Sequence, residues 1–323
     1  MTEKISLKRL TKRFGPILAV NGISLSVGSG EILGFLGPNG AGKSTTMRMI
    51  TGFIEPTSGT AEVLGKDVSR NPVDIKRCIG YLPEGAPTYG DMTAKSYLGF
   101  IAEIRGFFGA EKRRRIDTVV DNVNIKEVMN QPIDTLSKGF KRRVGLAQSL
   151  LHDPEILIMD EPTDGLDPNQ KHQVRTLIRE MSRDKAIIIS THILEEVEAV
   201  CSRAVIIAQG RLLADGTPQK LLAQASNHNA VVITIDKGIA NDELRREIKA
   251  IPGVADIENL PSINEDNETC RLRALPKDGS SIAEDIWKIL RSKNTPVREI
   301  FIERGALEDV FRQITAPENF ADA

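Results

Sequence analysis

The sequence contains few cysteines, few aromatic residues and no long apolar run. Its three cysteines, Cys78, Cys201 and Cys270, are far apart and form no C-x-x-C pair, which argues against a disulfide framework or a zinc site and favours a reducing compartment. Apolar runs such as Ala204–Ala208 fall far short of the roughly 20 residues of a membrane-spanning helix. Residues 1–6 lack the apolar core of a signal peptide. We therefore expect that another chain must cross any membrane at which this protein acts.

The chain also lacks an excess of charge of either sign. It has 43 Lys and Arg residues against 44 Asp and Glu residues, a net charge of −1, so no global attraction toward nucleic acid is expected. The basic run Lys112–Arg115 is interpreted as the solvated face of a helix rather than as a binding site. An apolar content of 40% in 323 residues is typical of a globular protein, and this length favours two domains.

The most specific feature present is a glycine-rich stretch that fits G-x-x-x-x-G-K-[ST] without a mismatch. A buried strand is predicted before it at Ile32–Leu36 and a helix after it at Lys43–Ile50, which is the context that this motif requires. Glycines let backbone N–H groups converge on an anion, and the helix start adds its positive dipole end. The alternative is a glycine-rich turn without a ligand. The stretch consists of Gly37, Pro38, Asn39, Gly40, Ala41, Gly42, Lys43, Ser44 and Thr45.

Two residues of this loop have expected roles of their own. Lys43 is predicted to reach the β- and γ-phosphates of a nucleotide, and Ser44 to ligate Mg²⁺. A second acidic element follows at Ile156–Asp160, an apolar strand that ends in a carboxylate and is followed directly by Glu161. Charges at the carboxyl end of a buried strand lie where open α/β sheets bind ligands. Asp160 is therefore expected to hold Mg²⁺, and Glu161 to orient and deprotonate water, although a strand that simply ends at the surface is the alternative.

Four further residues are candidates with an ordinary structural alternative each. Phe14, the one aromatic residue of the N-terminal strands, either stacks on a nucleotide base or packs in a sheet. Glu84 leaves a strand broken by Pro83, where it either meets Mg²⁺ or the attacking water, or stays solvated. Ser137 is predicted to cap a helix whose first N–H groups would form an anion site. His192 follows an apolar strand, where it either donates to a γ-phosphate or is structural.

A second domain is predicted after a polar linker at residues 224–229. The order of elements from 231 to 302 is strand, helix, strand, strand, helix, strand, which resembles a ferredoxin-like module. A final helix carries an amphipathic stripe that must pack on something. We expect an α/β P-loop domain at residues 1–224 with a helical subdomain at about 85–150, an α+β domain at 230–315 and a tail at 316–323.

The order of these motifs resembles that of the ATP-binding cassette (ABC) family over roughly residues 4–222. By this resemblance the protein is an ATPase that uses Mg²⁺. The resemblance implies the following roles: Gly37–Thr45 is the Walker A loop, Ile156–Asp160 the Walker B strand and Glu161 the catalytic base, while Ser137 and Gly139 belong to the signature, Asp167 to the D-loop, His192 to the switch and Phe14 to the adenine-stacking position.

The sequence departs from the family pattern at two positions. Glu84 stands where the family usually has Gln, although Tyr81–Glu84 is similar to a form found in ABC-2-type exporter ATPases. The signature has Lys138 in place of its first Gly, so that this lysine either contacts a phosphate or points to solvent. Leu307–Phe311 is also similar to the endings of ABC-2-type exporter ATPases, and Gly165–Gln170 is similar to the same segment in their gliding-motility-like and multidrug-like branches.

The resemblance also implies partners. The signature of one subunit closes over the ATP of the other, so a second nucleotide-binding domain is expected, in a homodimer or a heterodimer. A separate integral-membrane permease would place the protein on the cytoplasmic face of the cell membrane, where it would drive export, and no nucleic acid partner is expected. A soluble ABC ATPase acting on ribosomes or DNA is the main alternative. A GTPase or kinase is a further one, but the chain has no Asn-Lys-x-Asp motif.

Overall fold

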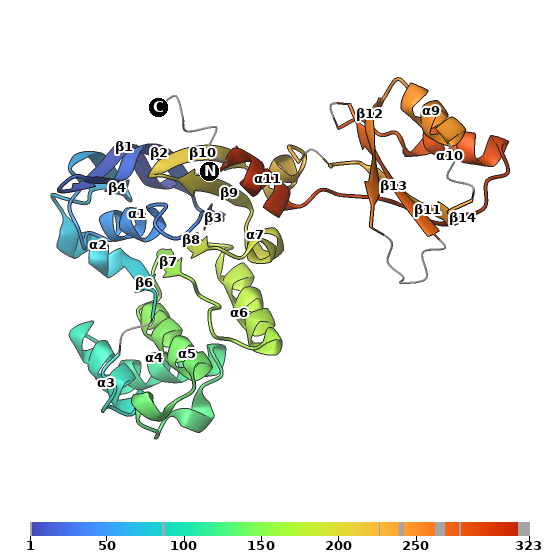
Figure 1. Cartoon of the computed structure of the whole chain (residues 1–323). Coiled ribbons are helices and arrows are strands. Elements are labelled where there is room, and N and C mark those ends of the chain that lie inside the picture. The colour runs from blue at the N-terminus through green and yellow to red at the C-terminus, as the bar shows by residue number, and fades with distance from the viewer. Residues whose placement is uncertain are drawn as a thin grey trace. The chain divides into compact units, whose positions relative to one another are not determined.

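A computed structural model describes residues 2–85, 88–225, 227–238, 242–261, 269–277 and 279–315 (Figure 1). The expected tail at 316–323, and Ser226 within the expected linker, lie outside these residues. The chain divides into two compact units, Met1–Thr217 and Pro218–Ala323, so that the division falls before the polar stretch at 224–229. The two units are described separately.

The first unit is built on a six-stranded sheet in the order β10-β9-β3-β8-β7-β6, which is parallel except for the pair β9 and β10. Every residue of β3, β7 and β8 is buried, as expected for apolar strands covered on both faces. The strands are β3 (Ile32–Leu36), β6 (Ile79–Leu82), β7 (Ile156–Asp160), β8 (Ala186–Thr191), β9 (Arg203–Ala208) and β10 (Arg211–Gly216).

A second, antiparallel sheet of the first unit has the order β2-β1-β4-β5. Its strands are β1 (Glu3–Phe14), β2 (Ile17–Gly28), β4 (Ser58–Val63) and β5 (Lys66–Asp67). Helix α1 (Lys43–Ile50) shares one apolar core with both sheets, because Met47 of α1, Leu7 of β1 and Phe35 of β3 belong to the same buried cluster. The predicted succession of strand, glycine loop and helix is confirmed by β3 and α1.

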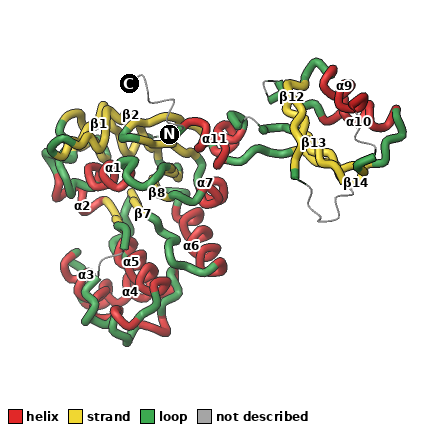
Figure 2. Tube along the Cα trace, viewed as in Figure 1, coloured by secondary structure: helices red, strands yellow, loops and turns green. Residues whose placement is uncertain are grey.

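Most helices of the first unit lie between β4 and β9 in the sequence (Figure 2). Three of them begin at side-chain caps: Thr93 accepts from Ser96 N, Ser137 from Phe140 N and Asp167 from Gln170 N. The expected cap at Ser137 is thus present. The helices are α2 (Pro72–Cys78), α3 (Ala94–Ile104), α4 (Gly109–Asn122), α5 (Lys138–Leu150), α6 (Pro168–Met181) and α7 (Leu194–Val200), with short 3₁₀ turns at Lys126–Val128 and Ile133–Thr135.

The second unit has the predicted βαββαβ succession, and its antiparallel sheet has the order β12-β13-β11-β14. Its core joins the sheet to α9 and α10, for example through Ile233, Leu272, Leu244 and Ile286. In the closing helix α11, Leu307 and Val310 are buried, as the amphipathic stripe requires. The elements are α8 (Pro218–Leu222), β11 (Val231–Asp236), α9 (Asp242–Ala250), β12 (Val254–Leu260), β13 (Thr269–Pro276), α10 (Ala283–Ser292), β14 (Val297–Ile302) and α11 (Leu307–Ile314).

Within the described part of the chain, no helix combines the length and the apolarity that a bilayer crossing demands.

Candidate active site

A cavity of about 370 Å³ opens beside the glycine-rich loop in the first unit. It collects residues from the N-terminal strands, the loop and the carboxyl ends of β6 and β7, which confirms that the acidic strand ends lie next to the loop. Of the predicted site residues, Gly37, Pro38, Ser137, Gly139, Asp167 and His192 are not among the described residues that line it. The lining residues are Phe14, Ala19, Asn39, Gly40, Ala41, Gly42, Lys43, Ser44, Thr45, Glu84, Asp160 and Glu161.

The loop leads directly into helix α1 through Gly42. Its φ of 102° lies in a region that side chains with a Cβ rarely adopt, and a Cβ on Gly42 would come within 2.5 Å of the Ala19 carbonyl oxygen. The first N–H groups of an α-helix have no acceptor inside the helix and carry the positive end of its dipole. The start of α1 therefore presents donors suited to a phosphate on the wall of the cavity.

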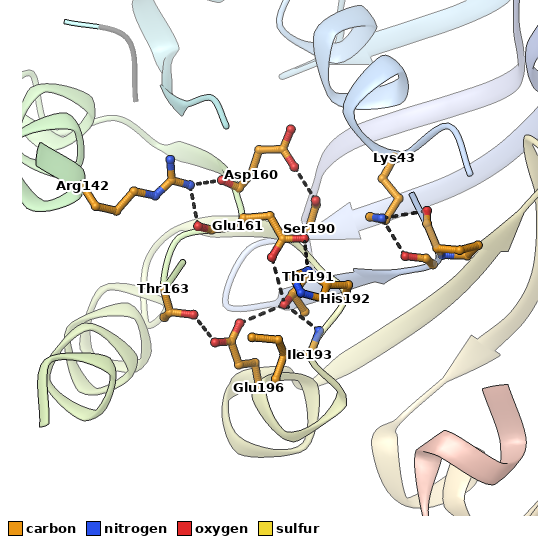
Figure 3. Close-up of polar contacts among 12 residues, drawn as sticks. Lys43, Arg142, Asp160, Glu161, Thr163, Ser190, Thr191, His192, Ile193 and Glu196 are labelled. Atoms are coloured by element: carbon orange, nitrogen blue, oxygen red, sulfur yellow. Dashed lines mark hydrogen bonds and ion pairs between the residues drawn. The ribbon is translucent and has the colours of Figure 1, made fainter. Parts of the chain in front are cut away.

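Lys43 is buried, at 6% exposure, and folds back over the loop. Its Nζ donates to the carbonyl oxygens of Gly37 at 2.6 Å and Pro38 at 3.1 Å (Figure 3). Burial lowers the pKa of Lys43, while the charges of Glu161, Asp160 and Glu84 act in the opposite direction. Gly37 and Pro38 thus hold the lysine at the cavity although they do not line it.

Asp160 is buried, at 2% exposure, and uses only one carboxylate oxygen within the protein. Its Oδ1 accepts from the Ser190 hydroxyl, whereas Oδ2 has no hydrogen-bond partner. An unpartnered buried oxygen is costly unless a ligand satisfies it. The described residues include no group of three or more His, Cys, Asp and Glu side chains that could hold a metal. Mg²⁺ commonly binds through one or two carboxylates and the phosphates of a substrate, so Asp160 and Ser44 fit a Mg²⁺–nucleotide.

Glu161 follows β7 and has a φ of +51°, in the left-handed region. Its N–H donates to the Ser190 carbonyl oxygen at 2.9 Å, and its carboxylate Oε1 lies 2.9 Å from Nδ1 of His192. A ring nitrogen facing a carboxylate must donate, so His192 carries its proton on Nδ1. Burial raises the pKa of Glu161, and the hydrogen bond from His192 opposes this rise. His192 therefore reaches the cavity only through Glu161.

Ser137, Gly139 and Asp167 lie together at the starts of α5 and α6. A Cβ added to Gly139 would meet Gln170 Oε1 at 2.7 Å, and one added to Gly165 would meet the Lys138 Cβ at 3.2 Å. The two helix starts are thus in close contact with each other. Lys138 itself is exposed.

The sequence patterns do not single out two buried charged residues of this region, Arg142 and Glu196. Arg142 of α5, at 5% exposure, donates to carbonyl oxygens at the ends of β6 and β7. Glu196 of α7, at 4% exposure, accepts hydroxyl hydrogen bonds from Thr163 and, at 2.9 Å, from Thr191. Arg142 could have been noticed as a charge next to the apolar positions of its predicted helix, whereas the partners of Glu196 come from segments that only the fold brings together.

Known proteins match both the sequence and the fold. The family model described as "ABC transporter" matches residues 20–164. The Nod factor export ATP-binding protein I of Burkholderia lata is 32% identical over 317 residues, which cover 97% of this chain and 97% of that protein. The chain belongs to the ABC transporter family.

The ABC protein is also 38% identical over 224 residues to the probable multidrug ABC transporter ATP-binding protein YbhF of Escherichia coli, a match that covers 69% of this chain and 39% of that one. The chain thus spans well under half the length of this relative. The solved dimeric structure of the ATP-binding cassette MJ0796 in a post-hydrolysis state, bound to ADP and Pi, has a TM-score of 0.61 at 23% identity and covers 66% of this chain and 98% of that one. It shows the same fold.

The comparisons confirm the family resemblance and the P-loop fold expected from the sequence of this ABC protein. They also favour a transporter ATP-binding subunit over a soluble ABC ATPase acting on ribosomes or DNA.

Proposed function

We propose that this ABC protein is the ATP-hydrolysing subunit of an exporter and that it drives a separate membrane permease. One observation carries the catalytic part: Lys43 and Ser44 of the glycine loop share a cavity with the strand-end carboxylates Asp160 and Glu161. Phosphoryl transfer to water requires groups that bind the phosphates and carboxylates that bind Mg²⁺ or activate water, and this cavity holds both kinds. A relative named as a Nod factor export protein supports the direction of transport.

In the proposed reaction, the loop N–H groups and the start of α1 bind the phosphates of ATP, and Phe14 at the cavity rim stacks on the base. Lys43 leaves its two loop carbonyls to contact the β- and γ-phosphates. Ser44, Asp160 and Glu84 would hold Mg²⁺, which supplies charge neutralisation at the phosphates. Glu161 accepts the proton of the attacking water, and His192 fixes the Glu161 carboxylate.

A second copy of the nucleotide-binding domain is proposed to complete the site. Ser137, Gly139 and Asp167 are family-matched positions, yet within one copy they do not line the described cavity. Ser137 nevertheless caps α5, whose first N–H groups form a further anion-binding helix start. These residues have a nucleotide to bind if they face the cavity of a partner. In this arrangement the start of α1 binds the nucleotide in its own cavity and the start of α5 binds the nucleotide of the partner.

The permease is proposed to dock on a second cavity of about 560 Å³ in the first unit. Its wall includes Phe53, which is 62% exposed and whose ring centroid lies 5.4 Å from that of Tyr81. Three cationic side chains also line this cavity, those of Arg48, Lys76 and Arg105. Aromatic residues and Arg are enriched at protein contacts, so the exposed Phe53 in a cavity lined by three cations supports this docking site. A permease segment with an apolar anchor and an acidic side chain would fit.

The Glu161→Gln variant tests the catalytic proposal. It should retain ATP binding and lose hydrolysis by a factor on the order of 10²–10⁴, because only the proton acceptor is removed. Near-normal turnover of this variant would remove Glu161 from the role of proton acceptor.

Purification of the intact protein from detergent-solubilised membranes tests the partner proposal. A multi-span membrane protein should accompany it, and ribosomal subunits as the sole partner would overturn the transport function.

A further inference from the structure

Arg142 contacts the two peptide groups that flank the α-carbon of Glu161. Its Nη2 donates to the carbonyl oxygen of Asp160 and, at 2.6 Å, to that of Glu161 (Figure 3). Its Nη1 donates to the Pro83 carbonyl oxygen at 2.8 Å. One guanidinium therefore joins the carboxyl ends of β6 and β7 to helix α5.

The backbone of Glu161 needs such support. A φ of +51° is unfavourable for a residue with a side chain and is uncommon outside Gly and Asn. Pro162 follows, and a proline disfavours helical conformations in the residue before it and pushes that residue toward extended ones. Such conformations persist at functional sites only when the surrounding contacts impose them.

The direction of the Glu161 side chain depends on this conformation. In the left-handed conformation its carboxylate lines the cavity beside Lys43 and accepts from His192. Relaxation to an extended conformation would rotate both peptide planes and carry the carboxylate away from this position. The contact from Glu161 N to the Ser190 carbonyl oxygen restrains one peptide plane, and the Arg142 guanidinium restrains both.

We propose that Arg142 is a positioning residue for ATP hydrolysis, which clamps the peptide groups on both sides of Glu161 and keeps its carboxylate directed into the cavity. The proposal rests on the proposed function, in which Glu161 accepts the proton of the attacking water. Because Arg142 belongs to α5, whose N-cap is Ser137, a shift of α5 against β7 would reach Glu161 through this clamp. Closure of a second copy on α5 would thus be linked to the alignment of the base.

The test compares Arg142→Gln and Arg142→Lys in the full-length protein. Gln is too short to bridge the two carbonyl oxygens, so kcat for ATP hydrolysis should fall on the order of 10²-fold, the effect of a misplacement of about 1 Å. The KM and the nucleotide affinity should stay within about threefold, because the phosphate-binding loop is untouched. Lys retains a charge and a donor and should recover part of kcat. A crystal structure of Arg142→Gln should show residue 161 away from positive φ.

Arg143→Gln is the matched control. Arg143 is the next residue of α5 and is also 5% exposed, but it donates to the Asn124 carbonyl oxygen at 3.1 Å and to Gln173 Oε1 at 3.3 Å instead. This variant should lose thermal stability to a similar degree and keep kcat per folded molecule within about threefold. Equal losses of kcat in the two variants would overturn the proposal, as would unchanged turnover or unchanged φ of residue 161 in Arg142→Gln.

The Glu161→Gln variant separates this proposal from the proposed function. If Glu161→Gln hydrolyses ATP normally, the proposed role of Glu161 fails, whatever the Arg142 variants do. If Glu161→Gln is inactive and Arg142→Gln is active, only the clamp fails. Should Arg142→Gln not fold, Arg142→Lys with its kcat and its residue-161 conformation decides the question.

Discussion

Thr191 places its hydroxyl between two carboxylates, at 2.9 Å from Glu196 Oε2 and 3.4 Å from Glu161 Oε2. A hydroxyl has one hydrogen to donate, so the shorter contact to Glu196 is the favoured hydrogen bond. The same oxygen accepts from Ile193 N at 3.1 Å. The turn that carries His192 is therefore anchored on the buried Glu196, and Glu161 keeps His192 as its closest donor.

Replacing His192 by Ala should lower kcat by about 10²-fold with ATP binding unchanged. The reason is that Nδ1 of His192 holds the Glu161 carboxylate at 2.9 Å, and general-base catalysis depends on that geometry. Steady-state hydrolysis and equilibrium binding of a labelled nucleotide measure the two effects. The exposed His172 of α6 offers a control, and His172→Ala should behave as the unmodified protein. An active His192→Ala protein would contradict the expected contribution.

Replacing Asp160 by Asn should raise the Mg²⁺ concentration needed for hydrolysis by about 10-fold or more. Asn has no negative charge, and its NH₂ group would take the place of the unpartnered Oδ2 that is expected to bind Mg²⁺. Its remaining oxygen would still accept the hydrogen bond from the Ser190 hydroxyl. Titration of ATPase activity with Mg²⁺ provides the measurement, and chelation with EDTA should abolish turnover of the unmodified protein. The exposed Asp184 supplies the comparison, because Asp184→Asn should leave the Mg²⁺ dependence unchanged.

Replacing Glu196 by Ala should destabilise the first unit by about 2–4 kcal/mol, since two buried hydroxyls lose their acceptor. The charges of Lys171 at 4.0 Å and Arg175 at 3.9 Å also lose their partner. Urea unfolding measures the change, and Glu195→Ala at the adjacent exposed position should cost less than about 0.5 kcal/mol. A double-mutant cycle with Thr163→Val should be non-additive, and strict additivity would show that the hydrogen bond contributes nothing.

The stability of the first unit should fall between pH 7 and pH 5 because of His152. Its Nε2 lies 3.1 Å from the Ile79 carbonyl oxygen, its Nδ1 has no partner, and burial lowers its pKa to about 4. The unfolded chain binds a proton at His152 near pH 6.5 and the folded chain only near pH 4, so acid favours unfolding across that window. The expected loss is about 2 kcal/mol between pH 7 and pH 5.

The His152→Gln variant should show a smaller loss of stability over the same pH range in urea unfolding. The His172→Gln variant serves as the control and should keep the slope of the unmodified protein. A slope that is unaffected by His152→Gln would assign the acid sensitivity to other groups.

The site could be predicted from the sequence where chemistry is concentrated in neighbouring residues. Gly37–Thr45 carries its own strand, loop and helix context, and Asp160–Glu161 follows directly on an apolar strand, so local patterns place both at the carboxyl edge of a sheet. The roles of these residues stay predictions until the variants are measured. Phe14 and Glu84 had ambiguous local patterns, and only the shared cavity brings them to the loop.

The sequence by itself determined the phosphate loop, the acidic strand end, the helix cap at Ser137 and the order of elements, because hydrophobic periodicity, turn residues and capping act over a few neighbouring positions. Only the tertiary structure decided that Arg142 holds the peptides around Glu161, that Glu196 joins Thr163 to Thr191, and that His192 reaches the cavity through Glu161. These contacts join residues up to tens of positions apart, and a buried charge selects its partners by the geometry of packed elements, which no local pattern encodes.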